Sequence, residues 1–130
     1  MAIIDPSQKF ISNSAIKIGG NLFDKIINSP NSAIFLAIEN QKAIGIVTIH
    51  KIPQIRKGTY CGEIEEMFVI PEYQGKGTAL HLLNTCINWA KQQNINIIRL
   101  ESSNDLQRAH GFYEKSGFRF YGRAYELKFE

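Results

Sequence analysis

The residues whose types and spacing suggest chemistry are the two glycines of the segment Gln74-Gly-Lys-Gly-Thr-Ala79. They lie between an extended apolar stretch and a long helical stripe, so they mark a turn from strand to helix. Glycine adopts backbone conformations that other residues avoid, and it lets a ligand approach the main chain closely. The first N–H groups of a helix have no partner within it, and the helix dipole adds about half a positive charge there. Such a turn is typical of an anion site, and above all of a phosphate site.

Two common phosphate motifs do not fit this turn. A P-loop containing Gly75-Lys76 needs a glycine at position 70 and a Ser or Thr after the lysine, but the chain has Ile70 and Gly77. A dinucleotide fingerprint that begins at Gly75 needs Gly or Ala at position 80, which is Leu80. On these residues alone, a plain glycine turn before a helix remains an alternative.

Three carboxylates form the second group with chemical potential. Glu63, Glu65 and Glu66 lie within the extended stretch Tyr60–Ile70. Central strands are mostly covered, so three carboxylates on one of them are hard to explain as solvated surface. Strand alternation places Glu63 and Glu65 on one face and Glu66 on the other, unless a bulge intervenes. We predict that at least one of the three has a functional role, and the pattern does not choose among them.

The elements that would position these residues follow from the spacing of apolar side chains. Helical stripes predict helices over 22–27, 79–90 and 106–113. Gly117 is typical of a C-terminal cap for the last of them. Runs rich in β-branched and aromatic residues predict strands over 33–39, 43–50, 60–70, 95–102, 118–121 and 125–129. Asn40-Gln41-Lys42 is expected to form a hairpin turn. Ile52–Gly58 is expected to form a loop, because Pro53 does not fit a central strand.

This order of elements predicts an α+β fold, a mixed α/β layer with helices packed on one twisted sheet. The 130 residues fit a single domain over 1–130, and 44% apolar with 21% charged residues fits a folded globular core. Lys and Arg exceed Asp and Glu by 15 − 12 = 3, which suits a small anionic ligand and is too weak to indicate nucleic acid.

Composition also sets expectations about location and metals. No apolar run approaches the ~18 residues of a membrane helix. The first residues lack the pattern of a signal peptide, so we expect a cytoplasmic protein without membrane contact. Cys61 and Cys86 have no framework spacing and are expected to be reduced and structural. His50, His81 and His110 are scattered without the spacing of metal ligands, so no metal is expected.

Two segments together resemble the GNAT superfamily of N-acetyltransferases. Gln74–Ala79 is similar to the acetyl-CoA motif Arg/Gln-x-x-Gly-x-Gly/Ala of that family, and it follows Val69-Ile-Pro71. Ala109–Phe118 is similar to the second signature, Ala-x-x-x-Tyr-x-x-x-Gly-Phe. Two motifs in the right order are far more specific than either one alone. The resemblance covers residues 33–129 and implies the GNAT-like acyl-CoA N-acyltransferase fold.

The resemblance implies that acetyl-CoA is the cosubstrate. In the family, backbone N–H groups of the turn bind the CoA pyrophosphate, which carries over to Gln74, Gly75, Lys76, Gly77, Thr78 and Ala79. The strand before the turn splays from its neighbour and binds the pantetheine arm, a place that falls to Met67, Phe68 and Val69. A further CoA contact is implied for Asn104, although Asn104 stands five residues before Ala109 and the family asparagine stands closer.

The resemblance also implies a reaction. Tyr113 matches the family tyrosine near the thioester sulfur, a general acid that protonates the departing CoA thiolate. A neutral amine attacks the thioester directly, and family members place a general base on the strand that holds Glu63, Glu65 and Glu66. The implied acceptor is a primary amine, most similar to the small molecules of the aminoalkylphosphonate and aminoglycoside acetyltransferases. Acetylation of a protein N-terminus or lysine is the alternative within the class.

An alternative from another class is a CoA-binding regulatory module without turnover. It is motivated by the N-terminal region, because family members carry a strand and helix there that this sequence has in reduced form at most. A missing first strand would leave a sheet edge exposed. We therefore expect a homodimer that covers this edge or completes the acceptor pocket.

Overall fold

The computed structural model describes residues 2–4, 20–103 and 105–129. The chain divides into two compact units, residues 1–99 and residues 100–130. The first unit holds most of a five-stranded sheet with two helices, and the second holds one helix and the C-terminal segment. The predicted α+β fold is confirmed.

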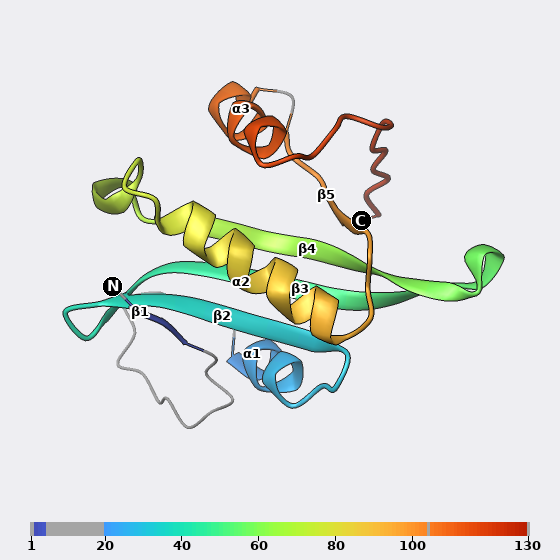
Figure 1. Cartoon of the computed structure of the whole chain (residues 1–130), viewed down its shortest axis with the longest axis horizontal. Helices are drawn as coiled ribbons and strands as arrows, with labels where there is room; N and C mark the ends of the chain where they lie inside the picture. Colours follow the sequence, from blue (N-terminus) through green and yellow to red (C-terminus); the bar gives the residue numbers. More distant parts are fainter. Residues whose placement is uncertain (1, 5–19, 104, 130) are drawn as a thin grey trace. The chain divides into compact units, whose positions relative to one another are not determined.

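The sheet has the strand order β1-β2-β3-β4-β5 (Figure 1). Each neighbouring pair from β1 to β4 is antiparallel. The strands are β1 (Ala2–Ile4), β2 (Ser32–Glu39), β3 (Lys42–Gln54), β4 (Thr59–Val69) and β5 (Ile98–Leu100). Residues 33–37 are all buried in the central strand β2, as expected for a strand covered on both faces.

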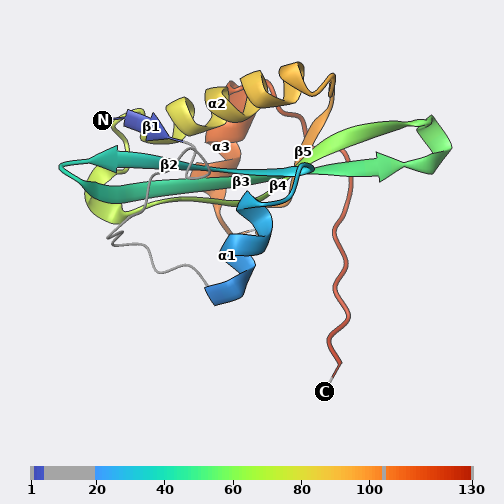
Figure 2. The same ribbon diagram turned by 90° about the horizontal axis from the view of Figure 1, so that it is seen from below.

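Two helices cover opposite faces of this sheet (Figure 2). Helix α1 (Gly20–Ile27) packs Phe23, Ile26 and Ile27 against a core cluster on β2 and β3. Helix α2 (Thr78–Gln92) lies on the other face, where Leu82 and Leu83 are fully buried. The sheet core therefore sits between α1 and α2, and α2 is held directly over β3 and β4.

Gly45 allows this close approach of α2. A side chain at this position would meet Leu82 Cδ1 at 3.1 Å, the Phe68 carbonyl oxygen at 3.2 Å and Val69 Cγ2 at 3.3 Å. All three contacts are tight for a Cβ atom. The absent side chain therefore lets helix α2 and the end of β4 meet over β3.

Both hairpins of the sheet bear on the predictions. Asn40 and Gln41 have φ of 51° and 61°, as a two-residue hairpin turn requires, so the predicted turn is confirmed. The predicted loop over 52–58 is wrong for residues 52–54, because β3 continues to Gln54 and Pro53 pairs with Tyr60, whereas residues 55–58 do connect the two strands. Pro53 is tolerated because the pairing of β2 with β3 ends at His50, so Pro53 lies in a two-stranded extension beyond the central sheet.

The N-terminal strand is present in short form. Residues 2–4 of β1 pair with 36–38 of β2, so part of the sheet edge that we expected to be exposed is covered. Cys61 and Cys86 are both free and buried, as predicted, and burial raises the pKa of the Cys86 thiol to about 12.

The second unit contains α3 (Gln107–Lys115). The predicted cap at Gly117 is confirmed: its φ is 97°, and the next residue, Phe118, donates its N–H to Tyr113 O at 3.0 Å. The predicted strands over 118–121 and 125–129 are wrong, since neither segment is in a strand. The strand expected over 95–102 is shortened to the three residues of β5.

Candidate active site

The turn between β4 and α2 has the predicted geometry. A short 3-10 helix, Pro71–Tyr73, ends the strand region, and Gly75 and Gly77 then adopt left-handed conformations with φ of 76° and 85°. Gly77 is the residue that precedes α2, and a Cβ atom built on it meets nothing within 4 Å. The turn therefore offers open space directly above the first turn of α2.

The start of α2 has backbone donors next to this turn. The first bond into the helix runs from His81 N–H to Gly77 O, 3.1 Å long. The N–H groups of Thr78, Ala79 and Leu80 precede it and so have no helical carbonyl available. Together with the positive end of the helix dipole, these donors fit a phosphate group.

Gln74 has a different position from the other predicted donors. Its backbone N–H donates to Pro71 O at 3.2 Å and closes the 3-10 turn. Its side-chain Nε2 donates to Val69 O at 2.8 Å. Gln74 thus ties the glycine turn to the end of β4, a positioning contact that the sequence did not predict.

Lys76 is exposed at the same turn. Its Nζ lies 5.4 Å from the ring centroid of Tyr73, a cation–π contact that keeps the ammonium beside the glycines. Ile70 N–H donates to Ile44 O at 2.9 Å, so β4 stays attached to β3 up to the residue before Pro71. The turn is therefore anchored on its strand side.

The pantetheine arm is expected to lie along the end of β4. The bond from Gly62 N–H to Ile97 O, 2.9 Å long, sets the start of β5 beside the first half of β4. The three residues of β5 are too few to extend from there to Met67–Val69. Among these three, Phe68 is 50% exposed, whereas Val69 is buried under α2.

A bulge in β4 changes where the glutamates lie. Thr48 of β3 pairs with Glu66, but the next residue, Ile49, pairs with Ile64. Glu65 is therefore an extra residue without a Cα partner on β3. Such bulges redirect side chains and occur often beside active sites.

The bulge turns Glu66 to the face of Glu63. Glu63 pairs with His50 and Glu66 pairs with Thr48, and both partners lie on one face of β3 because they are two residues apart. We predicted the opposite face for Glu66 only if β4 had no bulge. The extra residue Glu65 is such a bulge, so that prediction does not apply. Glu65 and Glu66 are exposed, whereas Glu63 is half-buried.

Glu63 stands at the end of a polar row across three strands. Ser32 pairs with His50, and Ser32 Oγ lies 2.8 Å from His50 Nδ1. His50 pairs in turn with Glu63, which places their Cβ atoms about 5 Å apart. The sequence analysis noted His50 only as a histidine without the spacing of metal ligands, and the strand register shows that it stands beside a candidate base.

This polar row lies on the same face of the sheet as α1, which packs over a different part of that face. Ile46 belongs to the core under α1, and its partner on β4 is the half-exposed Phe68. Helix α1 thus covers β2 and β3 but leaves Glu66 and Phe68 on β4 exposed. An acceptor molecule could approach Glu63 from this uncovered face.

Tyr113 lies on α3 in the second unit. Its ring makes edge-to-face contacts with Phe112 and Phe118, at centroid distances of 5.4 Å and 5.7 Å. Burial raises the pKa of the Tyr113 phenol above its usual value. The phenol therefore keeps its proton at neutral pH, as a general acid requires.

The segment before α3 is organised by polar contacts. Ser103 Oγ donates to Asp105 Oδ1, and this bond, assisted by the nearby His110, holds the pKa of Asp105 below its usual range. His110 Nε2 lies 2.7 Å from Ser103 O. Asn104, the further CoA contact that was predicted, lies outside the described residues.

Within residues 2–4, 20–103 and 105–129, no group of three or more His, Cys, Asp or Glu side chains is placed to hold a metal ion. None of the described helices combines the length and the apolar character needed to span a membrane.

The chain is similar to a known family of acetyltransferases. The model of the acetyltransferase (GNAT) family matches residues 9–118. The aminoalkylphosphonate N-acetyltransferase of Salmonella typhimurium is 27% identical over 90 residues, 69% of this chain and 58% of that protein. N-alpha-acetyltransferase 30 of Schizosaccharomyces pombe is 35% identical over 91 residues, 70% of this chain and 60% of that protein. The match thus spans less than two thirds of the length of either relative.

A solved structure has a similar fold. The structure of AAC(6')-Iy in complex with the bisubstrate analog CoA-S-monomethyl-acetylneamine superimposes with a TM-score of 0.73 at 18% identity. The superposition covers 82% of this chain and 75% of that one. At this identity the likeness concerns the fold alone.

Proposed function

Because the chain belongs to the GNAT acetyltransferase family, we propose that it is an acetyl-CoA-dependent N-acetyltransferase that acts on a primary amine. The amine nitrogen attacks the thioester carbonyl, the new C–N bond forms and the C–S bond breaks. The products are the N-acetylated amine and CoA with a free thiol. The family uses acetyl-CoA, and we extend this use to the present chain.

The observation that carries the proposal is the glycine turn before α2. Gly75 and Gly77 have positive φ, a Cβ atom on Gly77 would meet nothing within 4 Å, and the first N–H groups of α2 have no helical carbonyl to bind. This arrangement supports a pyrophosphate site with Gly75, Lys76, Gly77, Thr78 and Ala79 as its members. Gln74 then supports the site from behind, through its bond to Val69 O. The half-exposed Phe68, at the end of β4 before the turn, supports a place for the pantetheine arm along Met67–Val69.

The base that prepares the amine is, in this proposal, Glu63. At pH 7 only about one alkylamine molecule in a thousand is neutral, so a base that removes the proton contributes about 10²–10⁴-fold to the rate. Glu63 is half-buried and paired with His50, whereas Glu65 and Glu66 are exposed. Because Glu63 is less exposed and has an imidazole beside it, it is better suited than Glu65 or Glu66 to hold a proton-accepting water in place.

The acid that completes the reaction is Tyr113 in this proposal. A departing thiolate has a conjugate thiol pKa of about 8.5, so a phenol donates to it mainly as a strong hydrogen-bond donor. The raised pKa of Tyr113 keeps the phenol protonated for this role. Tyr113 stands at the tyrosine of the second family signature, within the matched residues 9–118.

The acceptor is, we propose, a small molecule. Relatives named for small amines include the aminoalkylphosphonate N-acetyltransferase and the aminoglycoside 6'-N-acetyltransferases. A relative named N-alpha-acetyltransferase 30 keeps protein N-terminal acetylation as the second candidate. Both candidates use the same glycine turn and base, and they differ in what approaches the open face beside Glu63.

The wider assembly is part of the same proposal. The family match spans residues of both compact units, which supports one acetyltransferase domain over 1–130. Two free, buried cysteines fit a reducing compartment such as the cytoplasm. We propose a homodimer on the basis of the C-terminal segment, in which Phe120, Tyr125 and Phe129 are each more than 80% exposed.

The experiment combines acetyl-CoA with a panel of primary amines and measures release of the CoA thiol. The panel holds aminoalkyl acids, aminoglycosides, free lysine and peptides with free N-termini, and reactions without amine are the control. We expect release with at least one small amine. Release only with peptides would favour protein acetylation. Binding of acetyl-CoA without release from any amine would contradict the enzymatic proposal and favour a CoA-binding module.

A further inference from the structure

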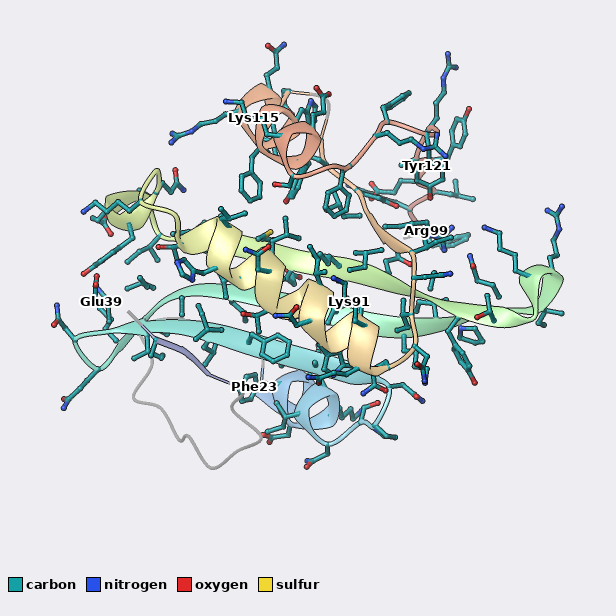
Figure 3. The ribbon with its side chains drawn as sticks, in the orientation of Figure 1. Phe23, Glu39, Lys91, Arg99, Lys115 and Tyr121 are labelled. Carbon is teal, nitrogen blue, oxygen red and sulfur yellow. The ribbon has the colours of Figure 1, made fainter. Side chains whose placement is uncertain are left out.

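A basic cavity lies at the β3–β4 hairpin, away from the glycine turn. It has a volume of about 580 Å³ and is lined by the hairpin residues Ile52–Lys57 and by Arg99 of β5. Its lining includes the cations Arg56, Lys57 and Arg99 and no acidic residue. Figure 3 shows Arg99 on the strand that follows α2, beside β4.

Arg99 is held in place within this cavity. Its Nη2 donates to Cys61 Sγ, 3.0 Å away, and Cys61 is fully buried. The planar guanidinium group is the cation best suited to the paired oxygens of a phosphonate, sulfonate or carboxylate. The cavity therefore has one cation anchored to a buried residue and two exposed cations on the hairpin.

The strand register connects this cavity to the candidate base. Ile52, in the cavity wall, pairs with Cys61. Glu63 follows Cys61 by two residues on β4 and lies on the same face. The Cα atoms of Cys61 and Glu63 are therefore about 7 Å apart. A single short molecule could thus place one end beside Glu63 and the other in the cavity.

We propose that this cavity binds an anionic group of the acceptor, so that the substrate is a short primary amine with an acidic group at its far end. This inference rests on the proposed function, because it assigns the amine to Glu63. The cations Arg56, Lys57 and Arg99 bind the acidic group, and the chain between the two groups sets the distance. Neutral and cationic amines of equal length lack this anchor.

The test compares amines that differ only in the terminal group. Aminopropylphosphonate, aminopropylsulfonate, aminobutyrate, butylamine and diaminobutane are each assayed with acetyl-CoA for kcat/KM. We expect the anionic amines to exceed butylamine by about ten- to a hundredfold, the effect of one charge-assisted contact. The ranking of phosphonate, sulfonate and carboxylate identifies the acid.

A double variant and a matched control locate the effect. Arg56→Gln with Lys57→Gln is expected to remove most of the preference for anionic amines and to leave butylamine unchanged. Lys51→Gln is the control, since Lys51 lies in the same hairpin over the Tyr60 ring but does not line the cavity. A rise in the KM for acetyl-CoA in the double variant, with the preference intact, would overturn the proposal.

The outcomes separate this inference from the proposed function. Equal activity on anionic and neutral amines would overturn the cavity assignment and leave the acetyltransferase proposal in place. If no amine reacts, the acetyltransferase proposal fails, and the cavity is then tested by propylphosphonate binding, followed through the ¹⁵N–H signal of the Arg99 side chain. A saturable shift that the double variant loses would support an anion site, and no shift would overturn it.

Discussion

Proton transfer during the proposed reaction depends on two side chains, Glu63 on β4 and Tyr113 on α3. The half-buried Glu63 stands beside His50, and the phenol of Tyr113 is enclosed by Phe112 and Phe118. In this proposal each side chain carries out one proton transfer, so one substitution removes one step. These residues therefore allow the most specific tests of the chemistry.

Changing Tyr113 to Phe is expected to lower kcat about tenfold to a hundredfold and to leave the affinity for acetyl-CoA unchanged. The lost hydroxyl no longer donates to the departing thiolate, while the ring contacts with Phe112 and Phe118 remain. Because burial raises the pKa of Tyr113, its proton is present at every pH below about 10. The wild-type kcat should therefore show no loss on the alkaline side below that pH. Loss of acetyl-CoA binding in the variant would instead indicate a structural tyrosine.

The three glutamates can be separated by identical substitutions. Glu63→Gln is expected to lower kcat/KM about a hundredfold at neutral pH, since the amide cannot accept the amine proton. Glu65→Gln and Glu66→Gln are matched controls within three residues of the same strand and should retain most activity. The measurement is the pH dependence of kcat/KM for all three. A larger loss in Glu65→Gln than in Glu63→Gln would contradict the assignment of the base.

At the residue scale, the sequence predicted the turn better than the base. Gly75 and Gly77 are recognisable because no other residue type fits positive φ so readily, and both have it. The face on which Glu66 lies depends on one extra residue in β4. No residue type in the sequence marks the position of this bulge in advance. The neighbour of Glu63, His50, depends on the same register.

Among the elements, the packing of α2 on β3 and β4 controls the position of the glycine turn. Leu82 and Val69 meet over Gly45, where no side chain separates them. Gln74 and Ile70 then attach the turn to the ends of these strands. The turn therefore depends on a helix–sheet contact as much as on its own glycines.

Gly45→Ala tests this contact. The new Cβ would lie 3.2 Å from the Phe68 carbonyl, which cannot move without shifting β4, so we expect the free energy of unfolding to fall by about 1–3 kcal/mol. Gly111→Ala is the control: this helical glycine has open space around it, and alanine should raise stability by up to about 1 kcal/mol. Urea unfolding measures both. Equal stability of Gly45→Ala and wild type would show that α2 does not need the close approach.

The elements predicted from periodicity were mostly found, and the failures share a cause. Helices α1, α2 and α3 were predicted because each has an apolar stripe that packing requires. The strands expected over 118–121 and 125–129 have the alternation of strands but no strand partner within the described residues. The continuation of β3 through Pro53 was missed because the sequence does not reveal that β2 stops pairing with β3 at His50.

For the whole molecule, the C-terminal segment is the feature that a single chain leaves uncovered. Phe120, Tyr121, Tyr125, Leu127 and Phe129 are between 60% and 87% exposed. Apolar side chains gathered in one exposed segment commonly mark an interaction site. The edge of β2 is partly paired by β1, so it is a weaker reason to expect a dimer.

We expect solution scattering at micromolar concentration to give twice the chain mass of 14.8 kDa. Replacing Phe120, Tyr125 and Leu127 together with serine should give a monomer, because the apolar surface that favours association is lost. Replacing the exposed Leu22 and Ile55 with serine is the control for a general change in solubility. A wild-type mass of one chain would contradict the homodimer.

Acetyl-CoA binding at the glycine turn is the central claim, and calorimetric titration of two glycine variants tests it most directly. Gly77 and Gly58 both have positive φ and open surroundings, but only Gly77 precedes α2. Gly58→Glu should bind acetyl-CoA like the wild type. Gly77→Glu places a carboxylate where the pyrophosphate is expected and should weaken binding by about a hundredfold or more. Wild-type affinity in a folded Gly77→Glu variant would contradict the claim.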